Sequence, residues 1–239
     1  MTTQIPLRIR LRDSSVFASY YPGRNKPAVD ALLAMAPAVP PTCVWLHGPR
    51  ASGKTHLLQA ACVKWSEQGA ATAYVPLREV DIDADGLNGY GQLPLVAIDD
   101  AEIIAGHDTV ERALFRLHQE LDESGGHLVV SGSSPPAALK FNLRDLASRL
   151  NGGLVLTLHA LDDDEQLKAL QLRAQLRGFE LPEETVQYLQ RRMPRDMASL
   201  CAFLDELDEA SLVAQRKLTV PFVREVLARV SGHSASHDG

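Results

Sequence analysis

The chain has 239 residues, of which 45% are apolar, 23% charged and only 5% aromatic. This composition fits a globular protein with one large core, or with a core domain and a smaller second domain. The formal charge of −6, from 24 basic and 30 acidic residues, argues against extensive nucleic-acid binding, which usually requires a basic surface. The three cysteines are far apart and lack metal-binding spacing, which is typical of structural thiols. No signal-peptide pattern or membrane-length apolar run occurs, so we expect no membrane association and a cytoplasmic location.

The first two segments in chain order are an arm and an α/β core. Residues 1–16 alternate apolar and basic side chains around a proline, and we expect an extended N-terminal arm. Residues 17–160 contain five apolar runs, which are CVWLHG, TAYVP, PLVAIDD, HLVVSG and GLVLTLH. Helical stretches, notably 54–68 and 109–123, lie between these runs. Apolar strands that alternate with helices predict an αβα sandwich around a five-stranded parallel sheet.

No strand-like run follows Leu158, and residues 161–230 predict a small helical domain. The expected helices cover 162–177, 182–193, a stretch from about 196 to 214, and 219–230, with caps and periodicity as the signals. The polar tail 231–239 is expected to be disordered.

The most specific motif is a complete GxxxxGK[ST] phosphate-binding loop, between an apolar strand and a helix, as the motif requires. Its residues are Gly48, Pro49, Arg50, Ala51, Ser52, Gly53, Lys54 and Thr55. Glycines let backbone N–H groups surround a phosphate, and the helix N-terminus adds partial positive charge. Lys54 is expected to reach the β- and γ-phosphate oxygens, and the Thr55 hydroxyl to bind Mg²⁺. A chance glycine-rich turn is the alternative, which the flanking strand and helix disfavour.

A second nucleotide-site signal is the apolar run 95–98 followed by two carboxylates, Asp99 and Asp100. A parallel strand delivers its carboxyl end to the same sheet edge as the phosphate-binding loop. Asp99 is expected to hold Mg²⁺ through water, and Asp100 to orient or deprotonate an attacking water. The alternative is a solvated acidic turn.

Four segments together resemble the AAA+ family, specifically the branch that contains the bacterial initiator DnaA. Besides the two motifs above, they are Phe17-Ala18-Ser19-Tyr20-Tyr21-Pro22-Gly23 with Asn25, then Asp145-Leu146-Ala147-Ser148-Arg149-Leu150, and Pro194-Arg195-Asp196-Met197. The resemblance implies an ADP or ATP cofactor with Mg²⁺, a trans-acting arginine finger at Arg149, and a nucleotide sensor at Arg195. It also implies contacts to the nucleotide from Tyr21, Pro22, Gly23, Asn25 and His56. Outside this resemblance, either arginine could be an ordinary surface residue.

Residues 167–182 and 214–223 are very similar to the Hda family of DnaA regulators, and the resemblance runs from Gln4 to about Leu227. Three departures matter. The phosphate-binding loop is intact, whereas it is degraded in some members. The polar or acidic sensor after the fourth strand is expected to be Ser133, which reaches less far. The chain ends soon after the helical domain without a helix-turn-helix domain, so we expect no sequence-specific DNA binding.

Gln4-Ile5-Pro6-Leu7-Arg8-Ile9 resembles the Q-x-x-L-x-[FLI] peptide with which Hda proteins bind the DNA polymerase III sliding clamp (beta subunit). Gln4, Leu7 and Ile9 would occupy a groove of the clamp, as short extended peptides do. By itself the pattern is weak, and an edge strand or a disordered arm is the alternative.

The resemblance therefore implies a clamp-tethered regulator that stimulates ATP hydrolysis by DnaA and prevents re-initiation of replication, with weak or no turnover of its own. The sequence leaves homo-oligomerisation open. It also leaves two other functions open, which are an autonomous helicase-loader type of AAA+ ATPase and a nucleotide-gated adaptor without enzymatic activity.

Overall fold

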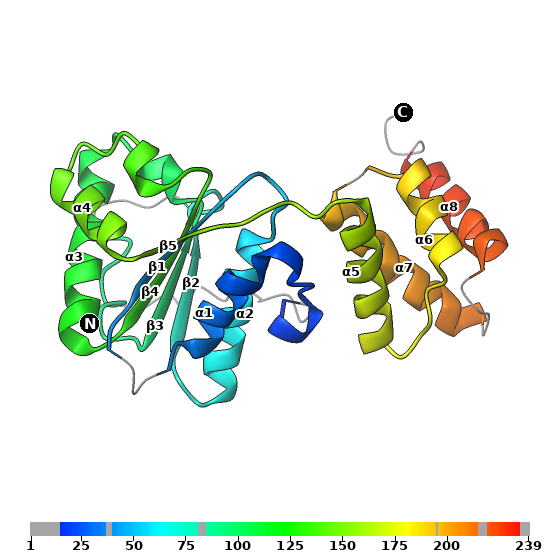
Figure 1. Cartoon of the computed structure of the whole chain (residues 1–239), viewed down its shortest axis with the longest axis horizontal. Helices are drawn as coiled ribbons and strands as arrows, with labels where there is room; N and C mark the ends of the chain where they lie inside the picture. Colours follow the sequence, from blue (N-terminus) through cyan, green and yellow to red (C-terminus); the bar gives the residue numbers. More distant parts are fainter. Residues whose placement is uncertain (1–14, 37–39, 81–84, 195, 215–218, 235–239) are drawn as a thin grey trace. The chain divides into compact units, whose positions relative to one another are not determined.

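The computed structural model describes residues 15–36, 40–80, 85–194, 196–214 and 219–234. They fold as two compact units, which divide between Ala160 and Leu161 (Figure 1). The first unit contains the sheet, and the second is helical. In the described part of the chain, no helix is long and apolar enough to cross a membrane.

All five predicted strands are present and form one parallel sheet with the order β2-β3-β4-β1-β5. Their bounds are Cys43–His47 (β1), Thr72–Pro76 (β2), Leu95–Asp99 (β3), His127–Gly132 (β4) and Leu154–Thr157 (β5). The central strands β3 and β4 are buried along their whole length, which explains why they are near-continuous apolar runs. The predicted α/β sandwich with a five-stranded parallel sheet is confirmed.

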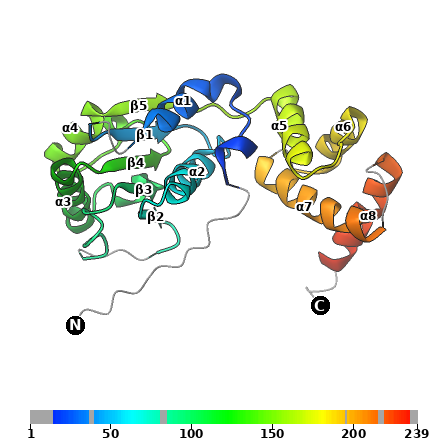
Figure 2. The same ribbon diagram turned by 90° about the horizontal axis from the view of Figure 1, so that it is seen from below.

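Helices cover both faces of the sheet, with α1 (Lys26–Ala34) and α2 (Lys54–Glu67) on one side and α3 (Asp108–Ser124) and α4 (Arg144–Gly152) on the other (Figure 2). Successive strand residues point to opposite faces. In β1, Val44 and Leu46 therefore join the core under α1 and α2, whereas Trp45 joins the core under α3 and α4.

The sequence analysis did not identify α1 or the short 3-10 elements. The latter are η1 (Phe17–Ser19), η2 (Gly23–Asn25), η3 (Ala101–Ile104) and η4 (Pro136–Ala138). Pro27 lies in the first turn of α1, where a proline is compatible with a helix because no intrahelical N–H bond is lost. Buried Ala28, Val29 and Leu32 then anchor this short helix to the sheet.

The second unit consists of α5 (Asp163–Leu176), α6 (Glu183–Arg192), α7 (Met197–Ala214) and α8 (Val220–Ser234). A reciprocal capping box starts α5, because Asp162 accepts from the Glu165 N–H and Glu165 accepts from the Asp162 N–H. The four helices enclose their own apolar core. Helix α8 continues to Ser234, so the expectation of a disordered tail from residue 231 is wrong for its first four positions.

A buried histidine, His127, begins β4 with no exposed surface. Its Nε2 lies 3.2 Å from the Ala36 carbonyl oxygen, and its ring packs edge-on against Trp65. Burial lowers the pKa of His127 below the ordinary value of 6.5, and the Ala36 carbonyl opposes part of that shift. The folded state therefore holds this imidazole neutral where the unfolded chain would begin to protonate it.

We expect the free energy of unfolding to fall as pH decreases below 6.5, by up to about 1.4 kcal/mol per pH unit from this one group, until its lower folded-state pKa is reached. Above pH 7.5, His127 does not make the free energy of unfolding depend on pH. Urea unfolding of the wild type and of His127→Gln, from pH 5.5 to 8, measures the difference. If the free energy of unfolding depends on pH identically in the two proteins, the lowered pKa assigned to His127 is wrong.

Candidate functional site

The phosphate-binding loop connects the end of β1 to the start of α2, and close contacts explain its two glycines. A Cβ on Gly48 would lie 2.3 Å from the carbonyl oxygen of Leu158, in the segment that follows β5. Gly53 has a φ of +89° directly before α2, a conformation that favours glycine. Its Cα faces the Tyr20 ring so closely that a Cβ would lie 2.6 Å from Tyr20 Cε2.

Lys54, the first residue of α2, turns its side chain back over this loop. Its Nζ donates to the carbonyl oxygens of Gly48 and Pro49, at 2.9 and 3.0 Å. The ammonium group therefore lies at the mouth of a helix N-terminus, which already favours anions. This arrangement fits the phosphate-binding role predicted for Lys54.

The carboxylate of Asp99 is the point where the site's elements converge. Asp99 is 2% exposed and ends β3. Its Oδ2 accepts hydrogen bonds from Thr55 Oγ1 at 2.7 Å and from the Tyr74 hydroxyl at 2.8 Å. Its Oδ1 accepts one from the Ser131 hydroxyl. Donors from α2, β2 and β4 thus fix the orientation of this carboxylate, and such charge-assisted bonds are the stronger kind.

Tyr74 and Ser131 are parts of the site that the sequence analysis missed. Both lie inside strands, where the apolar pattern gave no signal for a polar role. Burial and the adjacent Asp99 carboxylate raise the pKa of Tyr74 far above its usual value, which keeps the hydroxyl protonated as a donor. The expected sensor, Ser133, is exposed, and its N–H donates to Glu102, so Ser131 and not Ser133 is the serine that contacts Asp99.

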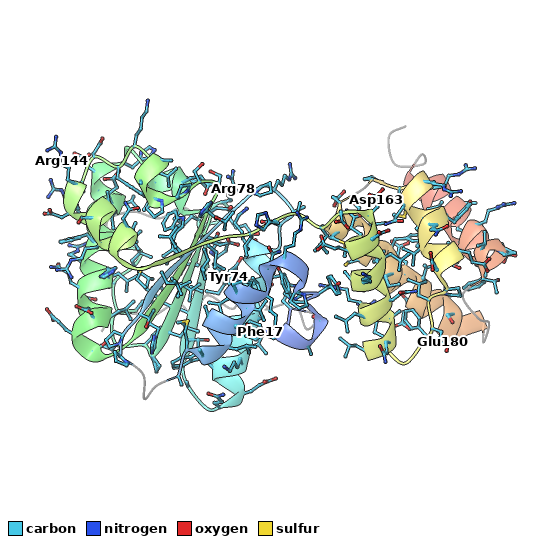
Figure 3. The ribbon with its side chains drawn as sticks, in the orientation of Figure 1. Phe17, Tyr74, Arg78, Arg144, Asp163 and Glu180 are labelled. Carbon is cyan, nitrogen blue, oxygen red and sulfur yellow. The ribbon has the colours of Figure 1, made fainter. Side chains whose placement is uncertain are left out.

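The neighbouring carboxylate, Asp100, is held by an arginine that the sequence analysis also missed. Asp100 adopts the left-handed conformation with φ of +59°, and its N–H donates to Ser131 Oγ. Arg78 lies just after β2, and its Nε is 2.9 Å from Asp100 Oδ2 (Figure 3 labels Arg78 and Tyr74). The Arg78 Nη2 is 2.8 Å from Glu102 Oε1, so one guanidinium bridges two carboxylates.

Burial, followed by the charges of Asp99 and Glu102, raises the pKa of Asp100, while Arg78 acts in the opposite direction. A raised pKa suits a group that takes a proton from water. The Arg78 contact, however, occupies one of the two oxygens of this carboxylate, Oδ2.

The segment before the core packs against the phosphate-binding loop through Tyr20, for which the sequence analysis gave no role. The Tyr20 hydroxyl donates to the Ser52 carbonyl oxygen at 3.2 Å and accepts from Asn25 Nδ2 at 3.0 Å. Burial raises the pKa of Tyr20 to about 12. The His56 ring lies 5.3 Å from the Tyr20 ring, and its Nε2 contacts the Val16 carbonyl oxygen.

Asn25 is 2% exposed and connects this segment to the residues after β5. Its Nδ2 donates to the His159 carbonyl oxygen and its Oδ1 accepts from the His159 N–H, at 2.9 and 2.7 Å. The amide thus bonds to the His159 backbone as well as to the Tyr20 hydroxyl, and it joins the segment before the core to the residues after β5. Tyr21 and Pro22 are half-buried beside it, and Gly23 begins η2.

The remaining predicted residues divide into two groups. Arg50 and Ala51 lie exposed on the loop next to Pro49, and Arg149 lies on α4, away from the loop. Arg195 and the three predicted clamp-binding residues, Gln4, Leu7 and Ile9, lie outside the described residues.

The oxygens of Thr55 and Asp99 are the donor set that Mg²⁺ prefers in nucleotide sites, where phosphate and water complete the shell. The Thr55 hydroxyl donates its hydrogen to Asp99, so the lone pairs of its oxygen are available to a cation. Within the described residues, no group of three or more histidine, cysteine or acidic side chains could hold a metal by itself. These residues therefore fit a cation that arrives with a nucleotide.

Comparisons with known proteins agree with this geometry. A family model described as "Hda, lid domain" matches residues 163–227, from the first residue of α5 into α8. Domain III of the Thermotoga maritima replication initiation protein DnaA is similar in structure, with a TM-score of 0.70, 21% identity, and coverage of 91% of this chain and 97% of that chain.

Two further solved structures share the fold. AMPPCP-bound DnaA from Aquifex aeolicus has a TM-score of 0.61 and 21% identity, over 76% of this chain and 61% of that chain. The Thermotoga maritima RuvB Holliday junction branch migration motor has a TM-score of 0.59 and 16% identity, over 86% and 68%. At these identities the similarity shows the fold alone.

The parallel sheet, the phosphate-binding loop and the acidic end of β3 define a P-loop protein of the AAA+ class. The family model that matches the helical unit adds a more specific similarity. The chain has the fold of DnaA-type AAA+ proteins, and its helical unit is similar to the lid domain of the Hda family.

Replacing Lys54 by Ala removes the only charged group that contacts both Gly48 and Pro49 among the described residues. We expect nucleotide affinity to fall about 10- to 100-fold, because hydrogen bonds to charged groups contribute about 1.5–3 kcal/mol. Titration calorimetry with ADP and with ATP measures this change. Lys26→Ala is the control, since Lys26 pairs with Asp30 on the surface of α1. Equal affinity in Lys54→Ala and the control would contradict the assignment.

Proposed function

We propose that this protein is a nucleotide-bound, sliding-clamp-tethered regulator that stimulates ATP hydrolysis by DnaA. Hydrolysis converts the initiator to its ADP form and prevents re-initiation of replication in the cytoplasm. The bound nucleotide, ADP or ATP with Mg²⁺, holds the regulator in its binding-competent form. The observation that carries the proposal is the position of Arg149 relative to the protein's own phosphate-binding loop.

Arg149 lies near the edge of the sheet where strands begin. It is three residues before the end of α4, and β5 starts at Leu154. Its Nη1 is 4.0 Å from Asp122 Oδ2, close to the end of α3 and just before β4 begins. The phosphate-binding loop leaves the opposite edge, where β1 ends. An α-helix of 17 residues such as α3 spans about 25 Å between these edges. Arg149 is therefore far from this chain's own nucleotide site.

An arginine so placed can serve a nucleotide held by another subunit. Its side chain is 48% exposed and that of Asp122 is 56% exposed, so their ion pair contributes at most about 1 kcal/mol. The guanidinium can leave Asp122 for a phosphate at low cost. A trans-acting guanidinium stabilises the charge that develops on the transferred phosphoryl group.

Hydrolysis by the protein itself is expected to be slow. The Arg78 guanidinium binds Oδ2 of Asp100, the candidate base, and its positive charge opposes proton uptake by that carboxylate. The intact phosphate-binding loop and the hydroxyl donors around Asp99 favour tight nucleotide binding, and this combination suits a regulator more than an autonomous ATPase.

Adenine specificity rests on the relatives and on the segment that carries Tyr20 and Asn25. Two of the similar solved structures are DnaA proteins bound to AMPPCP. We propose the same base for this chain. Arg195 is proposed to sense the bound nucleotide from the start of the region that leads into α7.

Arg149→Ala is expected to abolish stimulation of DnaA. An arginine finger contributes about 10³- to 10⁵-fold to the rate of hydrolysis, so the stimulated rate should fall by up to this factor. Its own nucleotide affinity and melting temperature should not change, because Arg149 is exposed on α4. Phosphate release from ATP-bound DnaA, with clamp loaded on DNA, measures the effect.

Arg144→Ala is the matched control, because Arg144 is an exposed arginine at the start of the same helix (Figure 3). A loss of equal size in both variants would reject Arg149 as the finger. If the wild type fails to stimulate DnaA, the proposed function is wrong. Turnover stimulated by DNA in the absence of DnaA would then select the helicase-loader function, and nucleotide-dependent binding without hydrolysis would select the adaptor.

The tether is tested by the double substitution Gln4→Ala and Leu7→Ala. We expect loss of measurable clamp binding in surface plasmon resonance, with unchanged nucleotide affinity, because the arm precedes the core in sequence. Thr2→Ala with Thr3→Ala is the control in the same arm. Unchanged clamp affinity in the Gln4/Leu7 variant would remove the tether from the proposal.

A further inference from the structure

A buried acidic side chain on α3 has no part in the nucleotide site. Glu111 lies in the first turn of α3 and has no exposed surface. A buried carboxylate destabilises a fold unless hydrogen bonds satisfy its oxygens. The donors that satisfy Glu111 are all backbone N–H groups from two loops.

The first loop is the one that follows η3. The Gly106 N–H donates to Glu111 Oε1 at 2.7 Å. Only η3 and Ala105 separate Gly106 from Asp100, so this loop is the direct continuation of the acidic end of β3.

The second loop leads into α4. The Asn142 N–H donates to Glu111 Oε1 at 3.1 Å, and the Leu143 N–H donates to Glu111 Oε2 at 2.7 Å. The Asn142 side chain strengthens the connection, since its Nδ2 donates to the Gly106 carbonyl oxygen and to Asp108 Oδ1. One carboxylate therefore joins two loops that are more than thirty residues apart in the chain.

This contact holds the two residues that directly precede Arg144, the first residue of α4. The N-cap position is Leu143, whose side chain has no oxygen to accept a backbone N–H. A carboxylate near a helix N-terminus is also favoured by the helix dipole. Glu111 therefore fixes where α4 starts, and α4 packs along α3 in both ribbon views (Figures 1 and 2).

Arg149 lies five residues beyond the start of α4, so the direction of its side chain depends on how that helix begins. We propose that Glu111 is a positioning residue for Arg149: it anchors the start of the finger helix to the loop that leaves the nucleotide site. This role rests on the proposed function, in which Arg149 acts on a nucleotide bound by DnaA. A finger that is displaced by about 1 Å can lose roughly 100-fold in rate.

The test uses Glu111→Gln, which keeps the size of the side chain but places an N–H₂ group against a backbone N–H. Asn142→Ala is a second, milder variant at an exposed position, and Glu123→Gln is the control on the exposed side of the same helix. All are assayed as the full chain, with clamp on DNA and ATP-bound DnaA, beside the wild type and Arg149→Ala.

We expect Glu111→Gln to lower the maximal stimulated rate roughly 10- to 100-fold. The concentration of regulator that gives half-maximal stimulation should stay the same, as should its nucleotide affinity, because neither requires the finger. Asn142→Ala should show a smaller loss in the same direction, and Glu123→Gln none. Hydrogen exchange should accelerate at the amides of residues 142–149, while α3 stays protected.

Three results would overturn the proposal. One is full stimulation by a folded Glu111→Gln protein. Another is a simultaneous fall in nucleotide affinity and melting temperature with a rise in the half-maximal concentration of regulator, which would mean a purely structural role. The third is an unchanged rate of hydrogen exchange at the amides of residues 142–149. This result rejects Glu111 as the anchor of α4, whatever the rate of ATP hydrolysis by DnaA. If the wild type itself fails to stimulate, or if Arg149→Ala stimulates normally, the proposed function fails, and the role of Glu111 towards the finger fails with it.

Discussion

The hydrogen bonds to the Asp99 carboxylate hold the nucleotide site together, because each donor comes from a different element of the core. Thr55 reaches it from α2, Tyr74 from β2 and Ser131 from β4. A carboxylate with 2% exposure is tolerated only when its oxygens are satisfied, so these donors and the end of β3 depend on one another. The Thr55 contact also sets the first turn of α2, and thereby the Lys54 ammonium beside the phosphate-binding loop.

The sequence predicted the architecture well because strands and phosphate-binding loop carry strong local signals. Five apolar runs matched five strands, and the glycines of the loop matched the close contacts with Leu158 and Tyr20. Helix α1 was missed because nine residues give a short periodic pattern, and its stability comes from packing on the sheet.

The site was predicted in part, and the missing residues share one cause. Arg78, Tyr74 and Ser131 act through partners that are 22 to 32 residues away in the chain. The spacing of residues in the sequence does not predict such a contact. The contact follows only from the strand order, which places β2 and β4 on either side of β3. Glu111 reads in sequence as an ordinary acidic residue of a helix first turn, and its burial becomes visible only once α4 is packed beside α3.

Hydrogen bonds on either side of Ala160 mark where one unit ends and the other begins. On one side, the Arg24 guanidinium holds the Ala160 carbonyl oxygen and Asn25 holds the His159 backbone, so the chain belongs to the nucleotide-binding unit up to this point. On the other side, Gln166 donates to the Leu161 carbonyl oxygen and Asp162 caps α5. Each unit therefore completes its own side-chain hydrogen bonds up to the Ala160–Leu161 peptide, and the boundary between the two units falls at this single peptide.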